Sequence, residues 1–248
     1  MEDQFIRTRM LLGANAMERL GKSHVAVLGL GGVGSWCAEA LCRSGVGELT
    51  LVDQDTVSVS NLNRQAAAVW STVGMEKTQA AAQRLAGIAP GCLLHPLSLR
   101  YEAGTREEFF QARYDYIVDA IDLVSCKLDL IETAHARAVP IISALGTGNK
   151  RDAQLLRLAD ISQTEGCPLA RVVRKELRRR GISRHRVVFS PEPPHAAGDG
   201  DEAPPPGRRS IPASAMWVPA AAGLLLAQAV ILELADSFSL EKKNQKEL

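Results

Sequence analysis

Residues 24–35 read HVAVLGLGGVGS, and this stretch decides the fold. The apolar run that ends at Leu28 is typical of a short buried strand, and the Ala-rich segment through Leu41 is typical of a helix. Between them lies a glycine-rich turn, formed by Gly29, Gly31, Gly32, Gly34 and Ser35. The missing side chains let backbone N–H groups approach phosphate oxygens, and the helix N-terminus favours negative charge. The stretch therefore predicts a nucleotide-binding turn.

Strand-like and helix-like segments alternate around this turn. Short apolar runs predict strands at residues 24–28, 48–52, 93–97, 116–120 and 140–144. Helical spacing predicts helices at 76–88 and 127–138. This alternation is typical of an α/β fold and predicts a Rossmann-like, doubly wound, mostly parallel sheet. We assign residues 1–150 to this nucleotide-binding region.

Residues 151–248 are interpreted as a C-terminal extension of the same domain. We expect strands at 153–159 and 186–190, a basic helix at 169–180 and a closing apolar helix at 220–234. Residues 191–212 hold seven of the twelve prolines, mixed with Gly, Asp and Glu, which predicts a mobile loop. Residues 241–248 (EKKNQKEL) are expected to form a solvated tail.

Composition narrows the class of protein. The 248 residues carry a formal net charge of +1, so binding to nucleic acid would need a local basic patch. The N-terminus lacks the apolar stretch of a signal peptide, and the longest apolar run, 216–232, is too short for a membrane span. No Cys-x-x-Cys pair occurs among the five cysteines, which are Cys37, Cys42, Cys92, Cys126 and Cys167. We therefore expect a cytoplasmic protein with reduced thiols, no membrane association and no structural zinc.

The glycine turn alone does not identify the nucleotide. Asp53 ends the second predicted strand, where its carboxylate can accept hydrogen bonds from both ribose hydroxyls. A Gly-x-Gly-x-x-Gly pattern followed by such an acid is also typical of NAD-binding enzymes. An NAD-dependent Rossmann oxidoreductase is therefore an open alternative at this point.

Polar residues after the predicted strands favour a triphosphate. They are Asp53, Asp55, Asn61, Asn63, Arg64, Gln65, Lys77, Asp119 and Asp122. Ligands of this fold bind outside the carboxyl ends of parallel strands, so these groups can converge. When a carboxylate attacks the α-phosphate of ATP and pyrophosphate leaves, the growing charge needs fixed cations and a metal ion. Arg64 and Lys77 are the candidate cations, and Asp122 is the candidate Mg²⁺ ligand.

Each of these residues also has an ordinary structural interpretation. Taken singly, Arg64 and Lys77 are solvated charges, Asp119 and Asp122 are helix caps, and the asparagines cap turns. Their joint position after the glycine turn favours the functional interpretation.

The sequence resembles the ubiquitin-activating-enzyme superfamily, whose bacterial members adenylate the C-termini of sulfur-carrier proteins. The resemblance covers about residues 5–150 and rests on GLGGVGS (29–35), LVDQDTVSVSNLNRQ (51–65), Lys77 and VDAID (118–122). It implies that Arg64 and Lys77 contact phosphates, that Asp122 binds magnesium, and that Asp53 binds ribose.

The same resemblance implies a homodimer. Arg7, in the segment FIRTRMLLG, would reach the ATP site of the partner subunit, or Arg9 would do so if the segment is shifted.

The second half resembles one branch of that superfamily, the tRNA threonylcarbamoyladenosine dehydratases. The matching segments are ALGTGNK (144–150), TEGCPLARVVRKELRRRGI (164–182) and HRVVFSPEPP (185–194). This branch implies ATP-dependent dehydration of a threonylcarbamoyl group on a tRNA adenosine, by cyclisation of a carboxylate activated as an acyl-adenylate. Two alternatives stay open: adenylation of a sulfur-carrier or ubiquitin-like protein, and the NAD-dependent oxidoreductase. A sulfur-relay or accessory protein is also left open.

A basic stretch, RVVRKELRRRGISRHR (171–186), is the candidate tRNA-binding surface. Its candidate RNA contacts are Arg171, Arg174, Lys175, Arg178 and Arg179. Helical spacing would let one face follow a phosphate backbone, although a merely solvated face is the alternative interpretation. Cys167 precedes this helix without a paired His, so we expect a buried or capping thiol there.

Overall fold

A seven-stranded sheet forms the centre of the protein in the computed structural model, which describes residues 3–196, 198 and 212–244. The strand order is β3-β2-β1-β4-β5-β7-β6, and every neighbouring pair is parallel except β6 and β7. The strands are β1 His24–Leu28, β2 Glu48–Val52, β3 Leu93–Leu97, β4 Tyr116–Asp119, β5 Ile141–Ala144, β6 Arg157–Asp160 and β7 Arg186–Phe189. The chain changes direction across the sheet between β1 and β4, and their carboxyl ends therefore flank the expected ligand crevice.

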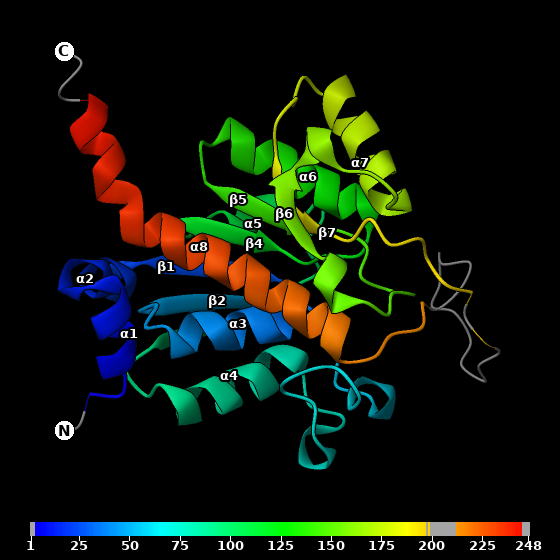
Figure 1. Ribbon diagram of the computed structural model, residues 1–248. Helices are drawn as coiled ribbons and strands as arrows, with labels where there is room; N and C mark the ends of the chain where they lie inside the picture. The colour runs from blue at the N-terminus through cyan, green and yellow to red at the C-terminus, as the bar shows by residue number, and fades with distance from the viewer. Residues whose placement is uncertain (1–2, 197, 199–211, 245–248) are drawn as a thin grey trace.

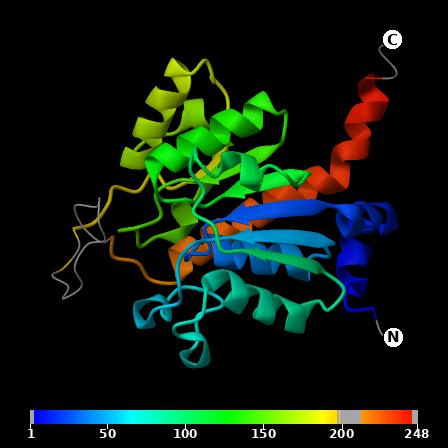
Figure 2. The same ribbon diagram turned by 180° about the vertical axis from the view of Figure 1, so that it is seen from behind.

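Helices cover both faces of the sheet (Figures 1 and 2). The α-helices are α1 Ile6–Leu12, α2 Ala14–Lys22, α3 Gly34–Arg43, α4 Lys77–Ile88, α5 Arg106–Phe109, α6 Val124–Ala136, α7 Pro168–Arg179 and α8 Trp217–Asn244. Single 3₁₀ turns lie at η1 Val59–Asn61, η2 Trp70–Thr72, η3 Ala153–Leu155 and η4 Ile161–Gln163. Helices α2, α3, α4 and α8 pack on one face of the sheet, and α5, α6 and α7 pack on the other.

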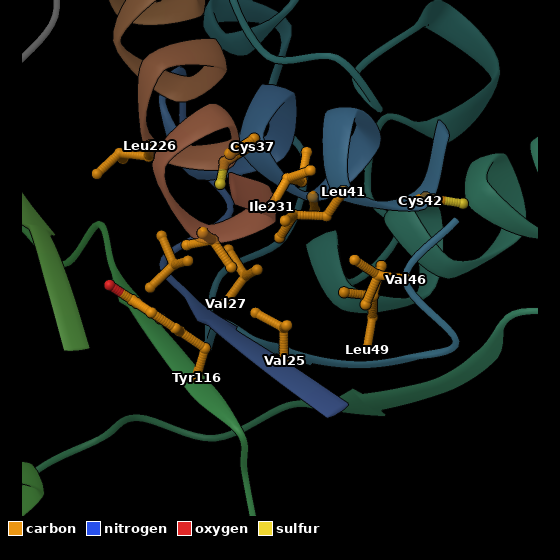
Figure 3. Packing of buried hydrophobic residues seen from close by; sticks show 14 of the residues in the cluster. Val25, Val27, Cys37, Leu41, Cys42, Val46, Leu49, Tyr116, Leu226 and Ile231 are labelled. Carbon is orange, nitrogen blue, oxygen red and sulfur yellow. The ribbon is translucent and has the colours of Figure 1, made fainter. Parts of the chain in front are cut away.

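Strand alternation explains the two cores. Successive side chains of a strand point to opposite faces, so β1 sends Val25 and Val27 to the α3 side and Ala26 and Leu28 to the α6 side. Figure 3 shows Val25 and Val27 beneath Leu41 of α3, with residues of α8 beside them. Because both faces are covered, the central strands β1, β2, β4 and β5 are largely buried and mostly apolar, as expected of a parallel sheet.

Helix α8 is the apolar helix that the sequence predicts, and it is longer than expected. It begins at Trp217 and continues to Asn244, through part of the segment predicted as a solvated tail. By length and composition, its stretch Trp217–Asp236 could cross a membrane. However, 56% of the most apolar 18 residues in this stretch are buried inside the protein. Packing against α2 and α3 therefore accounts for its apolar character.

The other predicted elements agree with the structure to within a few residues, with three additions. The strand predicted at 153–159 is a 3₁₀ turn, η3, followed by the shorter β6. Helices α1, α2 and α5 were not predicted. Of the predicted loop 191–212, residues 197 and 199–211 lie outside the described residues, so its mobility stays a prediction.

Candidate functional site

The glycine turn, residues 29–34, joins β1 to α3 in a conformation that requires glycine. Gly29 has φ +88°, and a Cβ added there would lie 2.6 Å from the carbonyl oxygen of Ala120. A Cβ at Gly34 would lie 1.8 Å from the carbonyl oxygen of Gly29. A Cβ at Gly31, in contrast, would meet nothing within 4 Å. The turn is therefore packed against the end of β4 on one side and open at Gly31, where phosphates have room to approach the backbone.

Asp53 holds this turn from the end of β2. Its carboxylate accepts hydrogen bonds from the backbone N–H of Leu30 at 2.7 Å and from that of Asp55 at 2.9 Å. Burial raises the pKa of Asp53, whereas the nearby ammonium of Lys77 and the two N–H donors act in the opposite direction. The position suits the predicted ribose contact, because the carboxylate faces the glycine turn.

Lys77 connects the start of α4 to the same acids. Its Nζ lies 2.9 Å from Asp55 Oδ2 and 3.9 Å from Asp53 Oδ1. The Lys77 side chain is 10% exposed, while that of Asp55 is 57% exposed. This ammonium is therefore held in place at the edge of the crevice, next to an acid that can turn into solvent.

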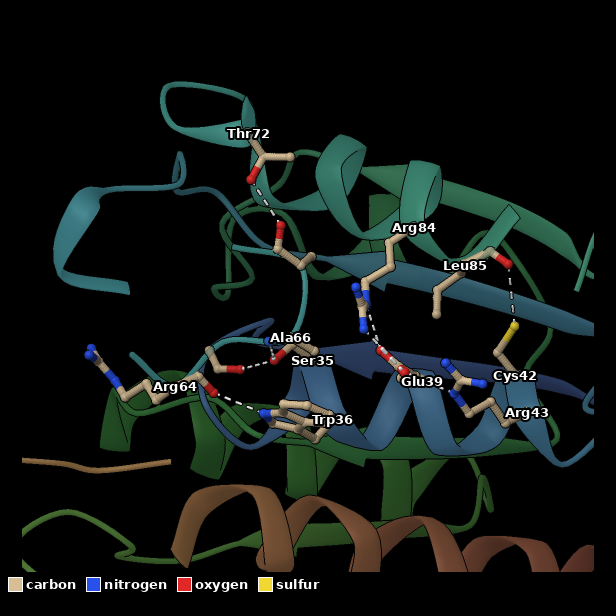
Figure 4. A network of polar contacts seen from close by, with 12 residues as sticks. Ser35, Trp36, Glu39, Cys42, Arg43, Arg64, Ala66, Thr72, Arg84 and Leu85 are labelled. Atoms are coloured by element: carbon tan, nitrogen blue, oxygen red, sulfur yellow. Dashed lines mark hydrogen bonds and ion pairs between the residues drawn. The ribbon is translucent and has the colours of Figure 1, made fainter. Parts of the chain in front are cut away.

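Arg64 lies over the glycine turn. A Cβ added to Gly32 would meet the Arg64 side chain at 3.4 Å. The guanidinium donates to the carbonyl oxygen of Ser60 at 2.7 Å and to Asn63 Oδ1 at 2.8 Å. The backbone carbonyl of Arg64 accepts a hydrogen bond from Trp36 Nε1 of α3 at 2.9 Å (Figure 4). The backbone at Arg64 is thereby fixed relative to α3.

Ser35 and the neighbouring amides are structural in this arrangement. Ser35 Oγ donates to the Gly31 carbonyl and accepts from the N–H of Ala66, which ties the turn to the segment after β2 (Figure 4). Asn61 is buried, and its Oδ1 accepts from the N–H of Ser58, as the capping interpretation predicts. Gln65 is buried beside it.

Asp122 follows β4 in an exposed loop that starts against the glycine turn. Asp119, at the end of β4, has a different role. It is fully buried and forms an ion pair with Lys127 of α6 at 2.6 Å. Its other oxygen accepts from the N–H of Ile121, so Asp119 fixes the loop that carries Asp122.

Arg7 lies far from the glycine turn of its own chain. Helix α1 packs on α2 near the amino ends of the strands, at the opposite edge of the sheet (Figure 1). Arg7 is exposed, whereas Arg9 is paired with Asp3 at 2.8 Å. Neither arginine joins the site within one chain.

The start of α8 lies beside the glycine turn, at the carboxyl ends of the strands. Pro219 lies against the glycine turn, since a Cβ on Gly32 would be 3.2 Å from it. Trp217 Nε1 donates to the carbonyl oxygen of Arg151 at 2.7 Å, and Asn63 Nδ2 donates to that of Ser214 at 2.9 Å. The segment 213–219 thus connects the loop after β2 with the loop after β5.

The predicted RNA contacts on α7 fall into two groups: residues that are bonded within the protein and exposed residues that are not. Arg174 donates to the backbone oxygen and the hydroxyl of Thr164, and Arg179 is paired with Glu176 at 3.2 Å. The exposed residues that have no ion-pair partner in the described parts of the chain form what we call the basic face: Arg171, Lys175 and Arg178. Their spacing of four and three residues places them on one side of the helix. Cys167 is buried and caps α7, with its Sγ accepting from the N–H of Ala170, as predicted.

Three buried charged residues of structural interest were not predicted. Glu39 of α3 pairs with Arg43 and with Arg84 of α4 (Figure 4). Glu192 and Lys150 are both buried near the carboxyl end of β5. Lys150 and Glu192 lie in segments that carry the family resemblance, but the sequence does not show that their side chains are buried.

One group of possible metal ligands lies at the amino ends of the strands. Ligand atoms of His24, Glu48 and His95 lie within 4.8 Å of one another. Glu48 already bridges the two rings, at 2.7 Å from His95 Nε2 and 3.5 Å from His24 Nδ1. Thr50 contacts the other nitrogen of His24 at 2.8 Å. The group is therefore satisfied internally.

These features define a Rossmann-like α/β protein, and the chain belongs to the ThiF family, whose model matches residues 5–232. Within that family it belongs with the tRNA threonylcarbamoyladenosine dehydratases. It is 39% identical to the Bacillus subtilis enzyme of that name over 99% of this chain and 100% of that protein. Identity to the Escherichia coli enzyme is 35%, over 71% of this chain and 65% of that protein.

A solved structure agrees with this assignment. The Escherichia coli tRNA N6-threonylcarbamoyladenosine dehydratase in complex with ATP matches with a TM-score of 0.85 and 30% identity, over 95% of both chains. A molybdopterin-synthase adenylyltransferase from Salmonella typhimurium is 38% identical, but over only 51% of this chain and 50% of that protein. The resemblance to the dehydratase branch is confirmed, and the predicted Rossmann-like fold is correct.

Proposed function

We propose that this protein dehydrates N6-threonylcarbamoyladenosine in tRNA in an ATP-dependent reaction. The observation that carries the proposal is the arrangement around the glycine turn. Arg64 and Lys77 lie on the β2 side of a turn whose backbone is open at Gly31, which suits a triphosphate better than the pyrophosphate of NAD.

The reaction follows from the needs of the substrate carboxylate. A carboxylate oxygen attacks the α-phosphorus, the bond from that phosphorus to the bridging oxygen breaks, and pyrophosphate leaves. The carbamoyl oxygen then attacks the acyl carbon, closes a five-membered ring and releases AMP. A proton is lost, and the net change in the nucleoside is the loss of one water. No enzyme nucleophile is required, which agrees with the buried, capping position of Cys167.

The chain's own residues have distinct tasks in this proposal. Arg64 and Lys77 neutralise the phosphates, and Asp53 orients the ribose. Asp122 is exposed, in the loop that starts against the glycine turn, and its carboxylate is a type of ligand that suits Mg²⁺. When bound, the metal ion would supply further neutralisation of the phosphate charge.

We also propose a homodimer in which α1 packs on the partner subunit. None of the residues of α1 is buried within one chain, and Ile6, Met10 and Leu11 are 57%, 81% and 83% exposed. An apolar helix surface of this kind is expected at an interface. Arg7 would then reach the site of the partner subunit.

The tRNA would bind along the basic face of α7, mainly through its phosphates. Because the described structure offers few aromatic side chains there, the shape of the RNA would matter more than base stacking. The cytoplasm, where tRNA is modified, is the expected location.

The deciding experiment is incubation with ATP, Mg²⁺ and tRNA that carries the threonylcarbamoyl group, followed by mass analysis of the nucleosides. Loss of one water from the modified adenosine, with release of AMP, supports the proposal. The homology to molybdopterin-synthase adenylyltransferases makes adenylation of a carrier-protein C-terminus the second candidate. If the carrier is adenylated and the tRNA is unchanged, the proposed function is wrong.

A further inference from the structure

Lys150 is a buried lysine without a counter-ion in the part of the chain that the structure describes. It lies in the loop after β5, which we call the β5 loop (residues 145–152). Lys150 is only 6% exposed, and its Nζ has no hydrogen-bond partner among the described residues. The other buried lysines of the described chain are paired, Lys77 with Asp55 and Lys127 with Asp119. A buried charge is strongly unfavourable unless an anion compensates it.

The backbone around Lys150 is fixed from three directions. The N–H of Asn149 donates to the Ala213 carbonyl, and Asn149 Oδ1 accepts from the N–H of Ala213, both at 2.7 Å. The N–H groups of Arg151 and Asp152 donate to the carboxylate of Glu192. The Arg151 carbonyl accepts from Trp217, as described above. Such a loop holds its side chains in a preorganised position.

Glu192 does not compensate Lys150. Its carboxylate is occupied by the two peptide N–H groups and by His195 Nε2 at 2.8 Å. Burial opposes ionisation of Glu192, but these donors lower its pKa below the usual value. Glu192 is therefore an anion whose hydrogen bonds stabilise the β5 loop, and the charge of Lys150 is left for something else.

The β5 loop lies between the two halves of the proposed site. On one side, Trp217 and Pro219 of α8 connect Arg151 to the glycine turn. On the other side, Gly146 packs against Cys167 at the start of α7, since an added Cβ would be 3.2 Å from the Cys167 sulfur. Lys150 is thus placed between the proposed ATP site and the helix that carries the basic face.

We propose that Lys150 binds the carboxylate that is to be activated, which in the proposed function is the carboxylate of the threonylcarbamoyl group. Arg64 and Lys77 lie on the β2 side of the glycine turn, whereas Lys150 belongs to the β5 loop, which contacts the start of α7. A carboxylate and a triphosphate repel one another. An ammonium at the carboxylate reduces that repulsion and holds the attacking oxygen near the α-phosphorus. This inference rests on the proposed function.

The first test compares two tRNAs, one with the threonylcarbamoyl group and one with the unmodified adenosine. For Lys150→Gln, affinity for the modified tRNA should fall at least about tenfold, because a charged hydrogen bond is lost. Affinity for unmodified tRNA and for ATP should stay within about twofold, since neither contact involves Lys150. Lys150→Arg should recover part of the loss, because it keeps the charge.

Arg151→Gln is the matched control. It removes a positive charge from the same loop, but the Arg151 side chain is exposed. We expect it to leave the preference for modified tRNA unchanged. An equal loss in both variants would show a general electrostatic effect and would overturn the proposal.

A second test measures thermal unfolding without ligands. Lys150→Met removes an uncompensated charge, so its unfolding midpoint should rise by about 2 °C or more while turnover falls. A lower midpoint would show that Lys150 stabilises the fold and would contradict the inference. If the wild-type protein itself does not dehydrate modified tRNA, the proposed function fails. If it does and Lys150→Gln is equally active, the Lys150 inference alone fails.

Discussion

The ends of β4 and β5 bury a lysine in opposite ways. After β4, Lys127 and Asp119 have fully buried side chains and form an ion pair at 2.6 Å, so the charge is compensated within the protein. After β5, Lys150 is buried without a partner in the described structure, beside a Glu192 whose hydrogen bonds go elsewhere. The charge of Lys127 is therefore structural, whereas we expect a ligand to compensate the charge of Lys150. Removing either member of the first pair should destabilise the fold, whereas removing Lys150 should stabilise it.

The largest effect is expected when the compensated pair is broken. Asp119→Asn keeps an acceptor for the N–H of Ile121 but leaves the Lys127 ammonium buried and unpaired. We expect the free energy of unfolding to fall by about 3–5 kcal/mol, measured by urea denaturation at pH 7.5. The double variant Asp119→Asn with Lys127→Met removes the stranded charge and should recover part of the loss. A double variant no more stable than the single one would show that the pair's charge is not the cause.

Lys77 is intermediate between these two lysines. It is buried, but its closer partner Asp55 is largely exposed and can be solvated when the ammonium is removed. Lys77→Met should therefore lower the free energy of unfolding by less than Asp119→Asn does, because the buried Asp53 loses only a cation at 3.9 Å. ATP affinity should fall about 10–100-fold, because a charged contact to the phosphates is lost. Titration with ATP, alongside urea denaturation, measures both. Unchanged ATP affinity would remove Lys77 from the site.

The sequence predicts the site residues that follow strands, because the fold brings the carboxyl ends of parallel strands together. It predicts Lys77 beside Asp53 and Asp55 for this reason. It does not predict which charges pair. Arg174 is engaged by Thr164, and Arg179 by Glu176, because side chains ten and three residues away happen to lie within reach. Lys150 lies in the segment ALGTGNK (144–150), but the sequence does not show its burial. Ala213 and Trp217 bond to its neighbours Asn149 and Arg151, and they approach this loop only in the folded chain.

His185 shows a third way to bury a basic group, which is to keep it neutral. It is 3% exposed and lies 2.8 Å from Ser143 Oγ, on the α6 side of the sheet. Burial, followed by the charges of His135 and Lys127, lowers the pKa of His185 to about 3. The unfolded chain binds a proton here below about pH 6.5, and the folded chain does not until about pH 3. The stability that neutral His185 contributes is therefore fully present above pH 6.5 and is lost as the pH falls from about 6.5 towards 3.

Between pH 7 and pH 5 this single group should cost about 2 kcal/mol of unfolding free energy. In His185→Asn, which cannot take up a proton, that part of the acid sensitivity should disappear. Urea denaturation of both proteins at the two pH values measures it. An equal loss in the two proteins would mean that His185 is protonated in the folded state.

The smallest expected effect contrasts a free and a paired cation on α7. Arg178 belongs to the basic face, while its neighbour Arg179 is paired with Glu176. If phosphates bind the basic face, Arg178→Glu should lower tRNA affinity several-fold and reduce the slope of log affinity against log salt by about one unit. Arg179→Glu changes the net charge equally and should alter the slope less. Equal slopes in the two variants would mean that tRNA responds to overall charge, and the specific face would have to be given up.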